Sequence, residues 1–310
     1  MSESIVVVGS LNMDFVVRVQ RLPAPGETTL GSDFQMLPGG KGANQACAAG
    51  KLAGPGVNVK MIGRVGYDVF GDHLKASLSA AGVDVSGVHA TRSQPTGVAL
   101  IWVERSGQNS IVVASGANHA LAASEVEAMR ATFRGAQFAL FQLESPLDTV
   151  ERAMKIARDE GVRTILDPAP AQALPPDVLA AVDILTPNET EASMLLGEEP
   201  RRISAEEGPA ISRRLRERGP RSVILKLGEQ GCVYIDESRE IYSPGFQVEA
   251  RDATAAGDIF NGALAAALVE GNSMDAALRF ANAAAAISVT RVGAQASVPL
   301  RTEVDRFLKG

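Results

Sequence analysis

Short apolar runs alternate with longer stretches of helical periodicity along most of this chain. Helical patterns, such as those over 147–160 and 203–218, separate several of the runs. The runs lie at 5–8, 57–62, 138–143, 164–166, 184–185 and 222–227. This alternation is typical of a parallel sheet that is covered by helices on both faces. We therefore predict an α/β protein with a three-layer, doubly wound, mostly parallel sheet.

Two pairs of segments depart from this alternation. The first pair is 15–19 with 29–35. The second is 97–103 with 109–114, which predicts a hairpin joined by 104–108 with no helix between its strands. We assign these strands, from about 14–39 and 97–115, to a small sheet outside the main one. The chain contains no internal repeat, low-complexity stretch or long linker, so residues 1–310 are expected to form a single domain.

A carboxylate stands at the start of an alanine-rich, apolar helix that is predicted over 259–268. Free N–H groups and the positive end of the helix dipole favour a phosphate over Ala255, Ala256 and Gly257. Asp258 lies beside that position and could accept a proton from an attacking hydroxyl, the role of the base in phosphoryl transfer. Alternatively, Asp258 only complements the helix dipole, which contributes about 0.3–1 kcal/mol.

A glycine-rich loop over 37–46 runs into a second alanine-rich helix and carries Lys41, Asn44 and Gln45. It has neither the spacing of a Walker A loop nor that of a dinucleotide-binding Gly-x-Gly-x-x-Gly turn. Glycines allow a ligand to approach the backbone, and the lysine and asparagine supply donors for sugar hydroxyls or a phosphate. A purely structural turn before a helix would have the same composition.

Segments 39–44 (Gly-Gly-Lys-Gly-Ala-Asn) and 252–258 (Asp-Ala-Thr-Ala-Ala-Gly-Asp) resemble the two signature regions of the PfkB carbohydrate kinase family. Further segments resemble the ribokinases of that family, in the same order along nearly the whole chain. They are 9–14, 25–28, 96–100, 142–146, 186–191 and 290–299. The resemblance implies ATP-dependent phosphorylation of D-ribose at O5, to give ribose 5-phosphate and ADP, with Asp258 as general base.

The carboxyl ends of parallel strands are where such sheets bind ligands, and polar residues follow the predicted strands there. Asn12 and Asp14 come just after the first strand, where a turn could direct them into a crevice. Glu144 follows the strand at 138–143. Their alternative roles are an Asx turn for the first two and a solvated loop residue for Glu144. The resemblance implies a ribose site made of Asn12, Asp14, Gly40, Lys41, Asn44, Glu144 and Asp258.

Asn188 is a predicted helix N-cap, and Glu191 three residues later fits a capping box. The resemblance implies further that Asn188 contacts nucleotide phosphates and that Glu191 orients Mg²⁺ through water, which suits an ion that binds few carboxylates directly. Lys226 replaces the threonine that the closest relatives are expected to have, and it could still reach a phosphate. The implied ATP-binding residues are Asn188, Lys226, Gly228, Gly231, Gly257 and, near the adenine, Asn282.

A monovalent cation site, for an activating K⁺, is also implied by the resemblance. Asp252 and Ser297 would contribute side-chain oxygens. Backbone carbonyls would come from Thr254, Ser288, Arg291 and Gly293. The ion would help to order the turn before Asp258. The pair Ala253-Thr254 departs here from the more common threonine followed by a hydrophobic residue.

Composition excludes several classes of function. The chain has 310 residues, a net charge of −6 and no basic run, which argues against nucleic-acid and membrane surfaces. Cys47, Cys232 and three scattered histidines provide no disulfide framework and no metal-ligand spacing. Without a leader or an apolar run of about 20 residues, a cytoplasmic location is expected. The resemblance implies a homodimer formed through the small sheet, which would also cover the sugar as a lid.

Other functions share parts of this pattern. A sister kinase for deoxyribose, fructose, adenosine or another small alcohol would share the ATP-binding half, so a substrate panel distinguishes it. A non-catalytic sugar-binding protein on the same fold would need neither Asp258 nor the turn before it. A ribosidase would not need the nucleotide loop at 226–231, so ATP binding distinguishes it.

Overall fold

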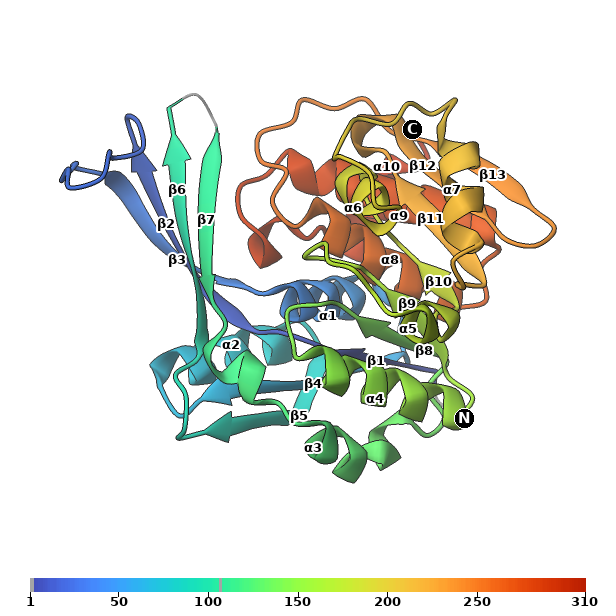
Figure 1. The fold of residues 1–310 in the computed structure, drawn as a ribbon, viewed down its shortest axis with the longest axis horizontal. Helices are drawn as coiled ribbons and strands as arrows, with labels where there is room; N and C mark the ends of the chain where they lie inside the picture. The colour runs from blue at the N-terminus through green and yellow to red at the C-terminus, as the bar shows by residue number, and fades with distance from the viewer. Residues whose placement is uncertain (1–2, 106–107) are drawn as a thin grey trace.

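The computed structural model describes residues 3–105 and 108–310, and its largest feature is a nine-stranded sheet (Figure 1). In sheet order the strands are β13 (Glu240–Pro244), β12 (Gly231–Ile235), β11 (Ser222–Lys226), β10 (Ile184–Leu185), β9 (Arg163–Leu166), β8 (Phe138–Phe141), β1 (Ser4–Val8), β4 (Asn58–Gly66) and β5 (Val83–Thr91). The last seven of these strands are parallel to one another, whereas β12 pairs antiparallel with both β11 and β13. This confirms the predicted, mostly parallel sheet.

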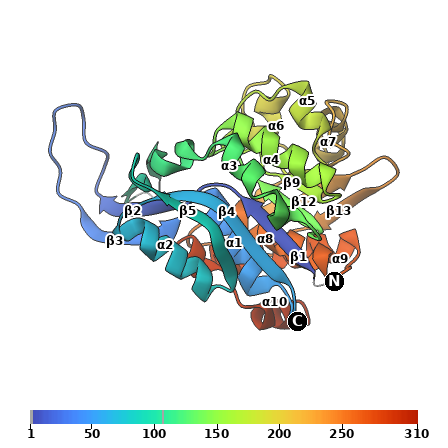
Figure 2. The same cartoon turned by 90° about the horizontal axis from the view of Figure 1, so that it is seen from below.

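Helices cover both faces of this sheet, which confirms the three-layer arrangement (Figure 2). Alternate residues of β1 enter the two cores: Ile5 and Val7 pack on one face, and Val6 and Val8 on the other. Because β1 is buried on both faces, its sequence is a continuous apolar run. One helical layer contains α1 (Lys41–Leu52), α2 (Val69–Ala80), α8 (Ala256–Val269), α9 (Met274–Val289) and α10 (Arg301–Phe307). The other contains α3 (Ala123–Ala128), α4 (Leu147–Asp159), α5 (Pro176–Ala180), α6 (Glu189–Leu195) and α7 (Gly208–Arg216).

A second, four-stranded sheet projects from the main body of the molecule (Figure 1). Its strands, in order, are β3 (Ser32–Gly39), β2 (Asn12–Val19), β6 (Gly97–Glu104) and β7 (Asn109–Ala114). β6 and β7 pair antiparallel, as the predicted hairpin requires. Part of the predicted connection, residues 106–107, lies outside the described residues.

The helix that the periodicity predicts over 203–218 is shorter in the structure, because α7 begins only at Gly208. Upstream, the Glu207 carboxylate accepts a hydrogen bond from Ser204 N over 3.0 Å, and these residues form a turn. Pro209 occupies the first helical turn, where its missing N–H costs no hydrogen bond. The hydrophobic periodicity of the sequence does not distinguish this turn from the helix that follows it.

Close packing between α1 and α8 brings their first turns together. A Cβ atom added at Gly262 would lie 2.6 Å from both Gln45 O and Ala48 Cβ, so the helices approach at a distance that only glycine permits. α1 starts at Lys41 and α8 carries Asp258 in its first turn. The two candidate motifs of the sequence are therefore neighbours in space.

Within residues 3–105 and 108–310, no helix combines the length and the apolar composition that a membrane span requires.

Candidate active site

The first turns of α1 and α8 meet above the carboxyl ends of the parallel strands, around a hollow of about 360 Å³. Strands β9, β10 and β11 each contribute a polar residue to it at or just beyond their last residue, namely Asp167, Asn188 and Lys226. This is the edge where open α/β sheets bind ligands. The predicted residues that line the hollow are Lys41, Asn188, Glu191, Lys226, Gly228, Ala255, Ala256, Gly257 and Asp258.

Asp258 is buried and is held by two amides from the first turns of α1. Asn44 Nδ2 donates to Asp258 Oδ2 over 3.0 Å, and Gln45 Nε2 donates to Oδ1 over 3.1 Å. Burial raises the pKa of Asp258 to about 6, against the opposing charge of Lys41. The carboxylate is therefore ionised at neutral pH and fixed in direction, which are the requirements for a general base.

This pKa predicts the acid limb of the pH profile. If Asp258 is the base, kcat/KM should fall at least tenfold per pH unit below pH 6, because the protonated carboxyl cannot accept the hydroxyl proton. Protonation of Asp14, whose pKa is about 7, adds to this fall. Initial rates between pH 5 and 8 in constant ionic strength measure this limb. A profile that stays flat down to pH 5, in protein that remains folded, would contradict the assignment.

The turn before α8 is shaped to bind an anion. Ala255 adopts a left-handed conformation with φ of 59° and is followed at once by the helix, where Ala256 N donates to Ala253 O over 3.2 Å. The next N–H groups of the first turn, from Gly257 on, have no carbonyl of their own helix as a partner. A Cβ atom added at Gly257 would lie 3.2 Å from Lys226 Nζ, so an ammonium group stands beside these amides. Backbone amides, the helix dipole and this lysine together favour a phosphate here.

On the other side of Asp258, Asn12 and Asp14 lie on strand β2 and not on the turn that the sequence suggested. Two residues apart on a strand, they face the same side of the small sheet. Asn12 Oδ1 accepts a hydrogen bond from Asn118 Nδ2 over 2.7 Å. Gly39 pairs with Asn12 on the neighbouring strand, and a Cβ atom at Gly39 would lie 2.1 Å from Asp14 Oδ2. Burial, with the charges of Glu144 and Asp258, raises the pKa of Asp14 to about 7.

Glu144 lies in the loop after β8, which ends at Phe141 and not at the predicted residue 143. Its Oε2 atom accepts hydrogen bonds from Ser10 Oγ over 2.5 Å and from Lys41 N over 3.1 Å. Glu144 is thus tied to the start of α1 and is not the solvated loop residue of the alternative interpretation.

Lys41 is the cation at the centre of this group of carboxylates. Burial alone would lower its pKa, but the charges of Asp258, Asp167, Glu144 and Glu191 outweigh burial and raise the pKa above its ordinary value. Lys41 therefore stays protonated and supplies both charge and donors between the two halves of the site.

The capping box predicted at the start of α6 is present. Asn188 Oδ1 accepts from Glu191 N over 2.8 Å, and Glu191 Oε2 accepts from Asn188 N over 2.7 Å. Burial raises the pKa of Glu191, while Lys226 lowers it. Capping fixes both side chains at the wall of the hollow, so structural and ligand-binding roles are compatible.

A second hollow of about 290 Å³ continues from the first and has largely apolar walls that include Phe246, Phe260 and Val289. Gly228 and Gly231 lie at its rim, with φ of 57° and 93°, values that favour glycine. Asn282 borders it and donates to Ser243 O over 3.1 Å. The shape and lining suit a planar base. The predicted residues at this hollow are Lys226, Gly228, Gly231, Gly257 and Asn282.

Asp252 joins two of the segments that the predicted monovalent cation site requires. Its Oδ2 atom accepts from Gly293 N over 2.8 Å, and its Oδ1 atom accepts from Thr254 N over 2.9 Å. The buried Ser297 hydroxyl donates to Ala294 O, and the Ser288 hydroxyl donates to Ala285 O. The segment with Arg291 follows the end of α9. The structure thus brings the segments together but shows no hydrogen bond between Ser297 and Asp252.

Three polar residues of the site were not predicted to belong to it, namely Gln45, Asp167 and Asn118. Asp167 forms an ion pair with Lys226, with Nζ to Oδ1 at 3.0 Å. Asn118 holds Asn12 and also accepts from Leu11 N over 2.9 Å. Asp167 follows a predicted strand directly, which is the signal that could have found it. Asn118 does not directly follow a predicted strand, so this signal does not find it.

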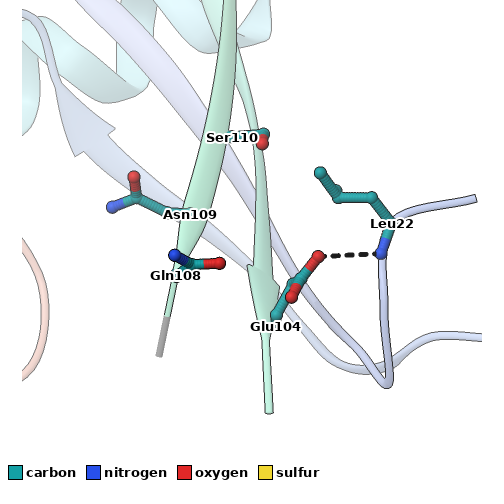
Figure 3. A pocket seen from close by; sticks show the side chains of 5 residues that line it. All are labelled: Leu22, Glu104, Gln108, Asn109 and Ser110. Atoms are coloured by element: carbon teal, nitrogen blue, oxygen red, sulfur yellow. Dashed lines mark hydrogen bonds between the residues drawn. The ribbon is translucent and has the colours of Figure 1, made fainter. Parts of the chain in front are cut away.

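A further hollow, at the far end of the small sheet, is lined by Leu22, Glu104, Gln108, Asn109 and Ser110 (Figure 3). Leu22 N donates to Glu104 Oε1 over 3.0 Å. Glu104 is the one ionisable side chain among these five, so this hollow lacks the convergent charges that phosphoryl transfer requires. We assign the active site to the hollow at α1 and α8.

The fold and the site define a class, the kinases that transfer a phosphoryl group to a small alcohol. The chain belongs to the pfkB family of carbohydrate kinases, whose sequence pattern matches residues 2–301. It is 42% identical to the ribokinase of Haemophilus influenzae, over 100% of this chain and 99% of that one. It is 33% identical to a deoxyribokinase of Salmonella typhi, over 98% of each chain. The structure of Arabidopsis thaliana ribokinase complexed with ribose and ATP covers 100% of both chains, with a TM-score of 0.89 and 35% identity.

Proposed function

We propose that this protein phosphorylates D-ribose at O5 with ATP, giving ribose 5-phosphate and ADP. The observation that carries the proposal is Asp258, a buried carboxylate held by two amides beside an anion-binding helix start. The full-length similarity to a ribokinase, and to a ribokinase structure with ribose and ATP, supports ribose as the acceptor.

Transfer proceeds in line, from the γ-phosphoryl group to the sugar hydroxyl. Asp258 accepts the hydroxyl proton as the O–P bond forms and the bond to ADP breaks. The amides of Ala255, Ala256 and Gly257 stabilise the charge on the transferring group, and Lys41 bridges sugar and phosphate. Asn12, Asp14, Gly40, Asn44 and Glu144 bind the ribose hydroxyls, and the small sheet closes over them and excludes water.

The nucleotide occupies the two connected hollows. Asn188 and Lys226 contact the phosphates, Gly228 and Gly231 let the backbone pass close to the nucleotide, and Asn282 lies near the adenine. Glu191 would orient Mg²⁺ through water, and the ion would neutralise charge on the nucleotide phosphates. No group of three or more His, Cys, Asp or Glu side chains within the described ranges could hold a metal, which suits an ion bound mainly by water and phosphate.

The segments that Asp252 joins would hold a monovalent cation such as K⁺ through oxygen atoms. The donor set is Asp252 and Ser297 side chains with the carbonyls of Thr254, Ser288, Arg291 and Gly293, and an oxygen-only set fits a hard cation. Bound there, the ion would supply positive charge near the turn at Ala255 and help to order that turn.

Asp252→Ala is therefore expected to lose K⁺ activation. Wild-type turnover should fall severalfold when K⁺ is replaced by tetramethylammonium at equal ionic strength, while the variant should be slow in both buffers. Asp84→Ala on the exposed part of β5 is the control, and it should keep the wild-type response. Equal wild-type rates in both cations would rule out the site.

A related kinase for deoxyribose, fructose or adenosine is the second candidate, favoured by the similarity to a deoxyribokinase. The polar group of Asn12, Asp14 and Glu144 argues for an acceptor with a full set of hydroxyls, because a site built to bind a hydroxyl strongly rejects an analogue that lacks it. A panel of ribose, 2-deoxyribose, fructose and adenosine measures this, and a higher kcat/KM for 2-deoxyribose would overturn the choice of ribose.

We also propose that residues 1–310 form one domain and that two copies associate through the small sheet, which exposes large apolar side chains. Ile111 and Val112 point to opposite faces of β7 and are 53% and 56% exposed. Ile111→Glu or Val112→Glu, whichever lies in the interface, should convert a two-chain species to a single chain in sedimentation velocity. A wild-type protein that sediments as one chain would contradict the dimer.

A cytoplasmic location is proposed as well. Cys47 and Cys232 are both free and buried, as suits a reducing compartment that also supplies ATP.

A further inference from the structure

The amide of Gln45 lies between two carboxylates that are far apart in the sequence. Gln45 lies in the first turns of α1 and is only 1% exposed. Its Nε2 atom is 3.1 Å from Asp258 Oδ1 and 3.0 Å from Asp167 Oδ2. Each of its two N–H groups thus has a carboxylate acceptor, and the amide bridges them.

Its two carboxylate neighbours set the direction of this amide, and a third residue completes its hydrogen bonds. Gln142 is fully buried, and its Nε2 atom donates to Gln45 Oε1 over 2.7 Å. Carboxylates accept and do not donate, so the reversed amide would place its oxygen against both of them and its donors against Gln142. Gly9 leaves the space for Gln142, since a Cβ atom there would lie 2.0 Å from Gln142 Oε1.

The second carboxylate leads to the phosphate side of the site. Asp167 Oδ1 is 3.0 Å from Lys226 Nζ, and that ammonium lies beside Gly257 in the anion-binding turn. Both side chains of the pair are largely buried, at 3% and 12% exposure. An unbroken series of contacts therefore runs from Asp258 through Gln45 and Asp167 to Lys226.

We propose that Gln45 is a positioning residue, which holds the Asp258 carboxylate in its reactive direction and links it to the Asp167–Lys226 ion pair that presents an ammonium to the transferring phosphoryl group. This inference rests on the proposed function. Gln45 acts through Asp258 and touches neither substrate. Small displacements of a reacting group from its productive geometry cost about 10²-fold in rate, so the expected effect falls on kcat.

Gln45 and Asp167 have opposite effects on the pKa of Asp258. Lys41 and Gln45 of α1 favour the ionised base, and the charge of Asp167 disfavours it, with Asp14 facing it from β2. Loss of the Gln45 donor should raise the pKa of Asp258. Loss of the Asp167 charge should lower that pKa.

Gln45→Met, which keeps the length of the side chain without its hydrogen bonds, should lower kcat about 10–100-fold with ribose KM within about twofold. The acid limb of its kcat/KM profile should move to higher pH. Asp167→Asn should move the limb to lower pH and raise KM for ATP. Gln137→Met is the matched control, because Gln137 bonds Ser4 N at the opposite end of β8, and its limb should stay in place.

Thermal denaturation identifies variants that fail to fold, and Asp167→Asn serves as the test if Gln45→Met is among them. Folded Gln45→Met with wild-type kcat and an unmoved limb, or a folded Asp167→Asn limb that moves upward, would overturn the inference while ribose phosphorylation by the wild type stands. A wild-type enzyme without ribose-dependent turnover would overturn the proposed function, and the inference with it.

Discussion

Asp258→Asn is expected to lower kcat with ribose by about 10²–10⁴-fold, with the protein folded and ribose still bound. The amide is the same size as the carboxylate and can still accept one hydrogen bond, but it cannot take the hydroxyl proton. Steady-state rates of ADP release, with ribose binding by calorimetry, separate the chemical step from binding.

The alternative role of Asp258 is to complement the helix dipole, and a second aspartate of this chain provides a control for that role. Asp275 also lies in the first turn of an alanine-rich helix, α9, but is exposed. Asp275→Asn removes a dipole contribution of about 0.3–1 kcal/mol and should leave turnover unchanged. If Asp258→Asn behaved like Asp275→Asn, with full turnover, Asp258 would not be the base.

Lys41→Met should produce the second large loss, about 10²–10³-fold in kcat/KM for ribose. The substitution removes the cation whose charge acts on Asp258, Asp167 and Glu144, and with it the positive charge that would stabilise the transferring phosphoryl group. Part of that loss should appear as a higher KM for ribose or ATP, since Lys41 lies between the sugar and phosphate sides. Titration of both substrates measures the division.

Lys155 lies on the exposed side of α4, so Lys155→Met is a control for the loss of a lysine outside the site. This variant should have the KM and kcat of the wild type. Unchanged KM and kcat in folded Lys41→Met would exclude Lys41 from the site.

The parts of the site that were predictable from the sequence are those encoded locally. A small-residue turn before an apolar helix marks the position of Asp258, and the glycine-rich loop marks Lys41 and Asn44. The capping box of Asn188 and Glu191 depends on a spacing of three residues, and the structure contains it.

The missing parts depend on long-range contacts. Asp167 meets Lys226 across 59 residues of chain, and Asn118 meets Asn12 across 106, so no local period reveals either pair. The first strand of the main sheet also leads almost directly into β2, and this placed Asn12 on a strand where composition suggested a turn. Pairing of strands from distant segments decides such positions.

Whether this protein is a ribose kinase is decided by ADP release from the wild-type protein with D-ribose, ATP, Mg²⁺ and K⁺, against the same mixture without sugar. We expect ribose-dependent ADP in equal amount to ribose 5-phosphate. No release above the control in folded protein, with any sugar or nucleoside of the panel, would contradict it.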